Sequence, residues 1–199
     1  MKLNLPTPEQ LKAAYDRDLI PAFPPAELKP LHNIQAMERR GLYRPWCLFD
    51  GEEIAGEAFL WLGRPGWALL DYLCVSQTRR NQGLGARILS AIREAEGPDT
   101  VILAESEAPI HAPDPPLARR RLDFYARNGL RTAGYDTEIF GVHYQTLYLA
   151  DRDLPDSAIA AEHRHIYQST FLKAKYDQYV RIPRDPTAAP APKIPWNED

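Results

Sequence analysis

The residues best suited to chemistry in this chain are a cation and two glycines in the spacing R-x-x-G-x-G: Arg80, Gly83 and Gly85. They follow an apolar, strand-like run at 69–75 and open a predicted helix. The first turn of a helix has unpaired N–H groups and partial positive charge, so it favours anions. Glycines let those amides approach an anion closely, and an arginine adds forked donors. The pattern predicts a phosphate-binding turn, with a plain helix start and two capping glycines as the alternative.

The amino-acid sequence of this turn does not match two common phosphate-binding motifs. The chain has no G-x-x-x-x-G-K-[ST], and no third glycine completes G-x-G-x-x-G. A second pattern follows downstream, where Phe124 and Tyr125 precede Gly129 and Leu130 at the end of a predicted helix. Together the two patterns resemble the acyl-CoA signature and the FY-x-x-x-G-F element of the GNAT superfamily of N-acyltransferases. Leu130 stands in place of the usual Phe.

The resemblance implies that acetyl-CoA is the co-substrate and that the turn after Arg80 binds its pyrophosphate. The residues implied to bind it are Leu73 and Val75, through their backbone groups, followed by Arg80, Asn81, Gln82, Gly83, Leu84, Gly85 and Ala86. Tyr125 is implied to be the general acid that protonates the departing thiolate, since a phenol with a pKa of about 10 can donate to a sulfur anion. The alternative for Tyr125 is packing of its helix against the sheet.

Three carboxylates are candidates for the general base that deprotonates an amine. Glu105 and Glu107 lie two residues apart in a predicted strand, so both side chains point to one face. Asp71 lies in an otherwise apolar strand, where an unpaired carboxylate is costly. We expect Glu105 to be the base, with Asp71 as the second choice. A salt bridge to one of the arginines at 119–121 or 127 is the alternative for each.

Histidines and cysteines offer little further chemistry. His163 and His165 are spaced i, i+2, which does not place them on one face of a helix, so we expect an exposed pair and no metal site. Cys47 and Cys74 fall in predicted strands and are expected to be buried free thiols, with one disulfide as the alternative.

The composition is that of an ordinary globular protein. The 199 residues are 44% hydrophobic and 26% charged, which is enough for one domain with a sizeable core. A net charge of −3 argues against nucleic acid as a partner. The chain shows no signal peptide and no long apolar run, so we expect a cytoplasmic protein without a membrane partner. A homodimer is compatible with the sequence.

Periodicity and turn residues predict an α+β fold. The expected helices lie at about 8–19, 25–40, 80–95 and 117–128, and the expected strands at about 43–50, 53–62, 67–76, 100–105, 130–138 and 142–150. The only candidate for the first strand that the resemblance implies is 2–5. The resemblance implies the GNAT fold, a central mixed, mostly antiparallel sheet flanked by helices. We expect this domain at 1–152, an extra C-terminal helical extension at 153–182 and a proline-rich, mostly disordered tail at 183–199.

The resulting functional hypothesis is an N-acetyltransferase that moves an acetyl group from acetyl-CoA to a primary amine of a small molecule or a protein. Two alternatives stay open: a catalytically inactive CoA-binding sensor, and an interaction module that recruits a partner through its C-terminal helix and tail.

Overall fold

A single mixed β-sheet organises the molecule. The computed structural model describes residues 1–191 and 193–196, and the strands within them lie in the order β1-β2-β3-β4-β5-β7-β6-β8. Their bounds are β1 (Lys2–Asn4), β2 (Tyr43–Asp50), β3 (Glu53–Leu62), β4 (Trp67–Val75), β5 (Val101–Glu107), β6 (Arg131–Ile139), β7 (Val142–Leu149) and β8 (Val180–Arg181). β4 and β5 are parallel, and the other neighbouring pairs are antiparallel. The α+β fold expected from the sequence is confirmed.

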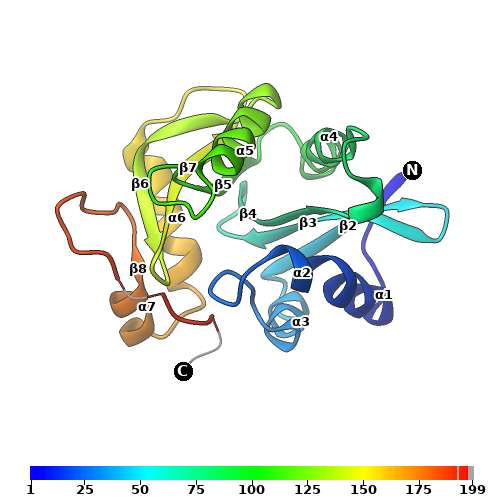
Figure 1. The fold of residues 1–199 in the computed structure, drawn as a ribbon, viewed down its shortest axis with the longest axis horizontal. Coiled ribbons are helices and arrows are strands. Elements are labelled where there is room, and N and C mark those ends of the chain that lie inside the picture. Colours follow the sequence, from blue (N-terminus) through cyan, green and yellow to red (C-terminus); the bar gives the residue numbers. More distant parts are fainter. Residues whose placement is uncertain (192, 197–199) are drawn as a thin grey trace.

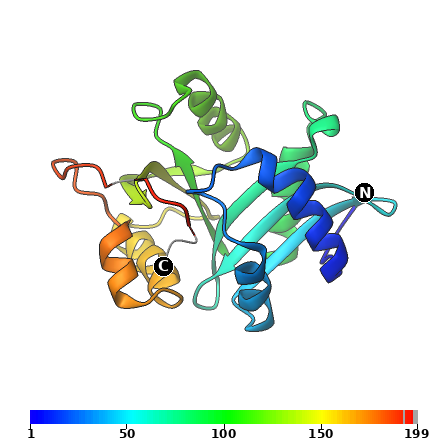
Figure 2. The ribbon, with the colours of Figure 1, turned by 60° about the horizontal axis from the view of Figure 1, so that its bottom comes forward.

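Helices cover both faces of this sheet (Figure 1). Their bounds are α1 (Pro8–Ala14), α2 (Ile20–Ala22), α3 (Leu31–Arg39), α4 (Leu84–Glu96), α5 (Pro115–Arg127), α6 (Asp156–Gln168) and α7 (Lys173–Tyr179). α4 and α5 lie on one face, and α1, α2 and α3 lie on the other, joined there by α6 and α7 (Figures 1 and 2). None of the described helices combines the length and the apolar character needed to cross a lipid bilayer.

Two apolar clusters fix the helices to the sheet. On one face, α4 buries Leu84, Ile88 and Ile92, which are spaced at helical intervals, against side chains of β3 and β5. On the other face, the cluster includes Ile34 of α3 and Ile159 of α6. Because β3 packs against helices on both sides, its residues from Ile54 to Trp61 are all buried.

β4 and β5 separate halfway along their length, and this divergence creates the space for a site. Trp67–Leu70 pair with Val101–Ala104, and no pairing between the two strands continues beyond these residues. A β-bulge at Asp71, which has no counterpart on β3, accompanies the divergence. The backbone of residues 71–75 is therefore without a strand partner on its β5 side.

The C-terminal region differs from the sequence-based expectations. The helical extension expected at 153–182 consists of two helices, because α6 ends at Gln168 and α7 begins only at Lys173. Residues 183–191 and 193–196, expected as disordered tail, make specific contacts: Arg184 pairs with Glu138, and the N–H of Trp196 donates to the carbonyl of Pro25 at 3.0 Å. Figure 2 shows this segment passing between α6 and the loop before α3. The rest of the expected tail, 192 and 197–199, lies outside the described residues.

The first strand implied by the resemblance is present as β1, which pairs with the outer edge of β2. α3 is shorter than the helix expected at 25–40, because Pro30 fixes its start and the residues before it form turns.

Candidate active site

A cavity of about 470 Å³ opens where β4 and β5 diverge. We call its α4–α5 side the cofactor end, which is lined by Leu73, Val75, Arg80, Leu117, Arg120, Phe124 and Tyr125. We call the opposite side the acceptor end, which is lined by Phe23, Glu27, Asp71, Tyr72, Glu105, Ile139, Tyr144, Tyr167 and Trp196. A wider open groove of about 1050 Å³ beside β1 contains none of the predicted site residues. The cavity thus brings together the three predicted catalytic residues with Leu73, Val75 and Arg80, whereas residues 81–86 of the predicted turn do not line it.

The predicted phosphate-binding turn lies at the cofactor end and has an unusual backbone. Gly83 is the N-cap of α4 in a left-handed conformation, with φ +74°, and Asn81 also has a positive φ of 62°. The first turn of α4 leaves its N–H groups without intrahelical acceptors. A side chain on Gly85 would lie 3.1 Å from the ring of Phe124, so the glycine lets α4 approach α5. Free amides at a helix start, reached by an arginine, fit a pyrophosphate.

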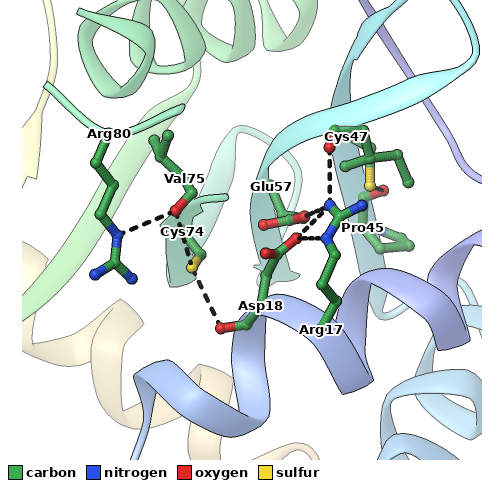
Figure 3. Close-up of polar contacts among 9 residues, drawn as sticks. Arg17, Asp18, Pro45, Cys47, Glu57, Cys74, Val75 and Arg80 are labelled. Atoms are coloured by element: carbon green, nitrogen blue, oxygen red, sulfur yellow. Dashed lines mark hydrogen bonds and ion pairs between the residues drawn. The ribbon is translucent and has the colours of Figure 1, made fainter. Parts of the chain in front are cut away.

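Arg80 is exposed and its side chain turns back toward the end of β4 (Figure 3). Its Nε donates to the carbonyl oxygen of Val75 at 3.4 Å. Long exposed side chains reorient readily, so Arg80 can reach either this carbonyl or an anion at the turn.

Cys74, between the two predicted backbone contacts Leu73 and Val75, is buried, and Cys47 is buried as well. Both are free thiols, as predicted. Burial raises the pKa of the Cys74 thiol to about 12, so it is not a nucleophile at neutral pH.

Tyr125 lies on α5 and lines the cavity from the cofactor end. Burial raises the pKa of its phenol to about 12, an effect opposed by the nearby Arg121. The phenol therefore keeps its proton at neutral pH and is available as a donor. No described residue hydrogen-bonds its hydroxyl, while its ring packs edge-to-face on Phe124 with centroids 5.4 Å apart.

Asp71, the second candidate for the base, lines the cavity but is fully engaged. Its two carboxylate oxygens accept from the ammonium of Lys29 at 2.7 and 2.8 Å, and Oδ2 also accepts from the hydroxyl of Tyr43. Burial raises the pKa of Asp71, and the ammonium of Lys29 opposes this shift. The expected partner was an arginine, but the actual one is a lysine that lies in the irregular segment before α3. A carboxylate in this position anchors the wall of the cavity.

Glu105, the first candidate for the base, is held from several sides. Its Oε1 lies 3.0 Å from Nε2 of His163 and accepts from the hydroxyl of Thr137 at 3.3 Å. Its Oε2 accepts from the hydroxyl of Tyr167 at 2.8 Å. Nδ1 of His163 in turn lies 3.2 Å from the hydroxyl of Tyr135. Since an ionised carboxylate can only accept, Nε2 of His163 carries a proton and donates to Glu105.

Glu107 lies on the same face of β5, as the spacing predicts, but it pairs with Arg121 at 3.2 Å. The salt-bridge alternative therefore holds for Glu107 and not for Glu105. Arg121 and Arg120 line the cavity, whereas Arg119 is exposed and does not.

The expectation of an exposed histidine pair is wrong for His163, whose side chain is fully buried. The physical reason is the face of α6: His163 follows Ile159 by four residues and precedes Tyr167 by four, so all three face the sheet. This spacing was the available signal for both His163 and Tyr167. Lys29 and Trp196 carried no such signal, since they lie in irregular segments. No group of three or more potential metal-ligating side chains occurs in the described part of the chain.

The chain was compared with protein families and with known proteins. The family model described as Acetyltransferase (GNAT) family matches residues 9–109. This stretch includes β4, the turn after Arg80 and Glu105, and ends before Tyr125. No curated protein matches the chain.

Solved structures share the fold at low sequence identity. A putative GNAT acetyltransferase from Bacteroides thetaiotaomicron is 19% identical with a TM-score of 0.70, over 87% of this chain and 100% of its own. The ribosomal-protein-S18-alanine N-acetyltransferase from Escherichia coli is 17% identical with a TM-score of 0.57, over 77% and 95%. A Bacillus subtilis acetyltransferase in complex with CoA is 17% identical with a TM-score of 0.51, over 75% and 97%. Because the family model matches more than half of the residues and these structures share the fold, the chain belongs to the GNAT family of acetyltransferases.

Proposed function

We propose that this protein transfers an acetyl group from acetyl-CoA to a primary amine of a small molecule or a protein. The observation that carries the proposal is one cavity that is lined by Arg80 and the phenol of Tyr125 on one side and by the carboxylate of Glu105 on the other. The CoA complex of the Bacillus subtilis neighbour supports the choice of co-substrate.

The cofactor end is suited to grip the co-substrate. Acetyl-CoA, when bound, supplies an activated thioester. Arg80 and the amides of residues 82–86 would hold its pyrophosphate through charge-assisted hydrogen bonds. The backbone of Leu73 and Val75, free of a strand partner on the β5 side, would bind the pantetheine arm. One N–H of this segment would polarise the thioester carbonyl.

Glu105 and Tyr125 would handle the two protons of the reaction. The amine nitrogen forms a bond to the acetyl carbon as the carbon–sulfur bond breaks. Glu105 takes one proton from the nitrogen, directly or through a water, and Tyr125 supplies one proton to the sulfur. Because the two side chains line opposite ends of the cavity, each can act on its own side of the reacting carbon.

The proposal can be tested first at the cofactor end. Calorimetric titration of acetyl-CoA into the wild-type protein should give micromolar binding, and an Arg80→Ala, Gly83→Ala double variant should lose it. Arg79→Ala is the matched control, because this neighbouring arginine pairs with Asp50 at 2.7 Å and does not line the cavity. Failure of the wild type to bind acetyl-CoA or any other acyl-CoA would overturn the proposal.

Turnover is the second test. Release of the CoA thiol, followed against a panel of primary amines, should be amine-dependent and should fall about 10²–10⁴-fold in Tyr125→Phe, the usual scale of a lost general acid. Binding of acetyl-CoA without turnover of any amine would instead indicate a CoA-binding sensor.

A further inference from the structure

The acceptor end of the cavity has walls made largely of rings. Phe23, Tyr72, Tyr144, Tyr167 and Trp196 all line it. The rings of Phe23 and Tyr72 pack edge-to-face with centroids 5.0 Å apart. Aromatic faces bind apolar bodies, and they also attract cations through their quadrupole.

The hydroxyl groups of Tyr72 and Tyr167 already form hydrogen bonds within the protein. Tyr72 donates to the carbonyl of Glu27 at 2.9 Å and accepts from the N–H of Lys29 at 2.8 Å. Tyr167 donates to Glu105. These hydroxyls are therefore not free to recognise a polar substituent, and the surface they leave to an acceptor is that of their rings.

Cations near the acceptor end already face carboxylates. Lys29 pairs with Asp71, and Arg121 pairs with Glu107. Lys193, at an adjoining cleft of about 220 Å³, faces Glu27. Burial and the nearby Glu107 raise the pKa of Glu27. The other cations that line the cavity, Arg80 and Arg120, belong to the cofactor end.

Glu105 is the carboxylate at this end that no described lysine or arginine neutralises. Its three hydrogen-bond partners are His163, Thr137 and Tyr167, and Lys29 acts on it only at longer range because this lysine is paired with Asp71. The acceptor end thus offers a carboxylate that has no described lysine or arginine in contact with it and is surrounded by rings. This environment favours a cation on an apolar body, and an anion there would lie beside a like charge without a free cationic partner.

Trp196 closes this end of the cavity from the C-terminal segment. Its side chain is only 6% exposed and packs on Phe140, with ring centroids 4.5 Å apart. The ammonium of Lys29 lies 3.7 Å from the centre of the indole. An acceptor that fits here must have a body compact enough to lie against Trp196 within a cavity of about 470 Å³.

We propose that the acceptor is a compact primary amine carried on an aromatic or aliphatic body without an anionic group, and that Trp196 selects for this body. The inference rests on the proposed acetyl transfer and names its substrate class. 2-Phenylethylamine represents the class, and phenylalanine differs from it only by a carboxylate.

The test compares kcat/KM for these two amines, measured by release of the CoA thiol. We expect 2-phenylethylamine to be favoured by at least about 100-fold, because juxtaposed like charges cost several kcal/mol. A lysine-containing peptide completes the panel. Equal or better turnover of phenylalanine or of the peptide would overturn the proposed class and leave acetyl transfer intact.

Variants of Trp196 and a binding measurement test the acceptor site separately from the acetyl-transfer reaction. Trp196→Ala should lower kcat/KM for 2-phenylethylamine about tenfold with little change for methylamine, and Trp196→Phe should restore most of the loss. Trp46→Ala is the control, since Trp46 bonds to Glu96 away from the cavity. 2-Phenylethylamine should bind to the wild-type protein–CoA complex in calorimetry, and Trp196→Ala should weaken this binding by a similar, about tenfold, factor. Binding without turnover would support the acceptor site and reject the proposed reaction, whereas no binding would reject the substrate class.

Discussion

At the cofactor end of the cavity, nearly all candidate residues come from one continuous stretch, residues 73–86, and most act through backbone groups. At the acceptor end, Phe23, Asp71, Glu105, Tyr167 and Trp196 come from five separate segments and act through side chains. A backbone turn needs only a few glycines and a helix start, so it is encoded locally. A pocket of side chains needs the whole sheet to bring its members together.

This difference has consequences for how each end responds to substitution. At the cofactor end the proposed ligand contacts are shared among several amides, so we expect the loss of one side chain to weaken binding without destroying the site. At the acceptor end single side chains hold one another through buried charges and hydrogen bonds, so one change leaves others unpaired. The two ends are therefore separable by mutation, and four predictions test that separation, beginning with the largest expected effect.

Glu105→Gln should separate chemistry from co-substrate binding. The amide cannot take the proton of the amine, so we expect kcat to fall about 10²–10⁴-fold while the Kd for acetyl-CoA changes less than about twofold. Rates of CoA release and calorimetry measure the two quantities. Glu107→Gln is the control, because this carboxylate pairs with Arg121 and should lose less than about tenfold. Normal turnover by Glu105→Gln would place the base elsewhere.

Lys29→Met should show how strongly the acceptor end depends on its buried ion pair. Both Lys29 and Asp71 have nearly buried side chains, so removing one leaves an uncompensated charge that costs about 3–5 kcal/mol of unfolding free energy. Urea denaturation measures the loss. Adding Asp71→Asn to the same variant should recover part of it. A single variant as stable as the wild type would mean that the pair does not hold this wall.

Arg80→Ala should act only at the cofactor end. Loss of charge-assisted hydrogen bonds to a phosphate, about 1.5–3 kcal/mol, should raise the Kd for acetyl-CoA about 10–100-fold. The KM for the amine at saturating acetyl-CoA should stay unchanged. A parallel change in both constants would indicate that the two ends are coupled and would contradict the comparison.

Glu57→Gln should have the smallest effect on the two ends of the cavity and should act only through a pH-dependent gain in stability. Glu57 is fully buried on β3 opposite Cys74, and Arg17 lies 3.8 Å from its carboxylate (Figure 3). Burial and the neighbouring carboxyl of Asp18 raise the pKa of Glu57 to about 9, and Arg17 opposes this shift. Between its unfolded pKa of about 4.5 and this value the folded state binds more protons, so stability falls as pH rises.

Glutamine has no proton to lose, so the variant should lack this pH slope. Thermal unfolding at pH 5 and pH 8.5 should show a gain of several kcal/mol over the wild type at the higher pH and little difference at the lower. An equal gain at both values would assign the effect to packing instead of ionisation. The Kd for acetyl-CoA should not change.

Most helices and strands of the fold could be predicted from local sequence patterns. The strands from 43 to 75 and the helix after Gly83 match the predicted ranges within one or a few residues, because glycine and proline turns mark their ends. Thr7, for example, caps α1 with a reciprocal bond to Gln10, as a capping box predicts. The break between α6 and α7 was missed, since the apolar stripe continues across it.

The sequence by itself determined the sheet-and-helix order, the glycine turn at the start of α4 and the shared face of Glu105 and Glu107, because each depends on residues close along the chain. Only the tertiary structure decided that Asp71 pairs with Lys29, that His163 and Tyr167 hold Glu105, and that Trp196 closes the acceptor end. These contacts join residues separated by tens of positions. Their partners are chosen by the crossing of helices over the sheet, and no local spacing encodes that choice.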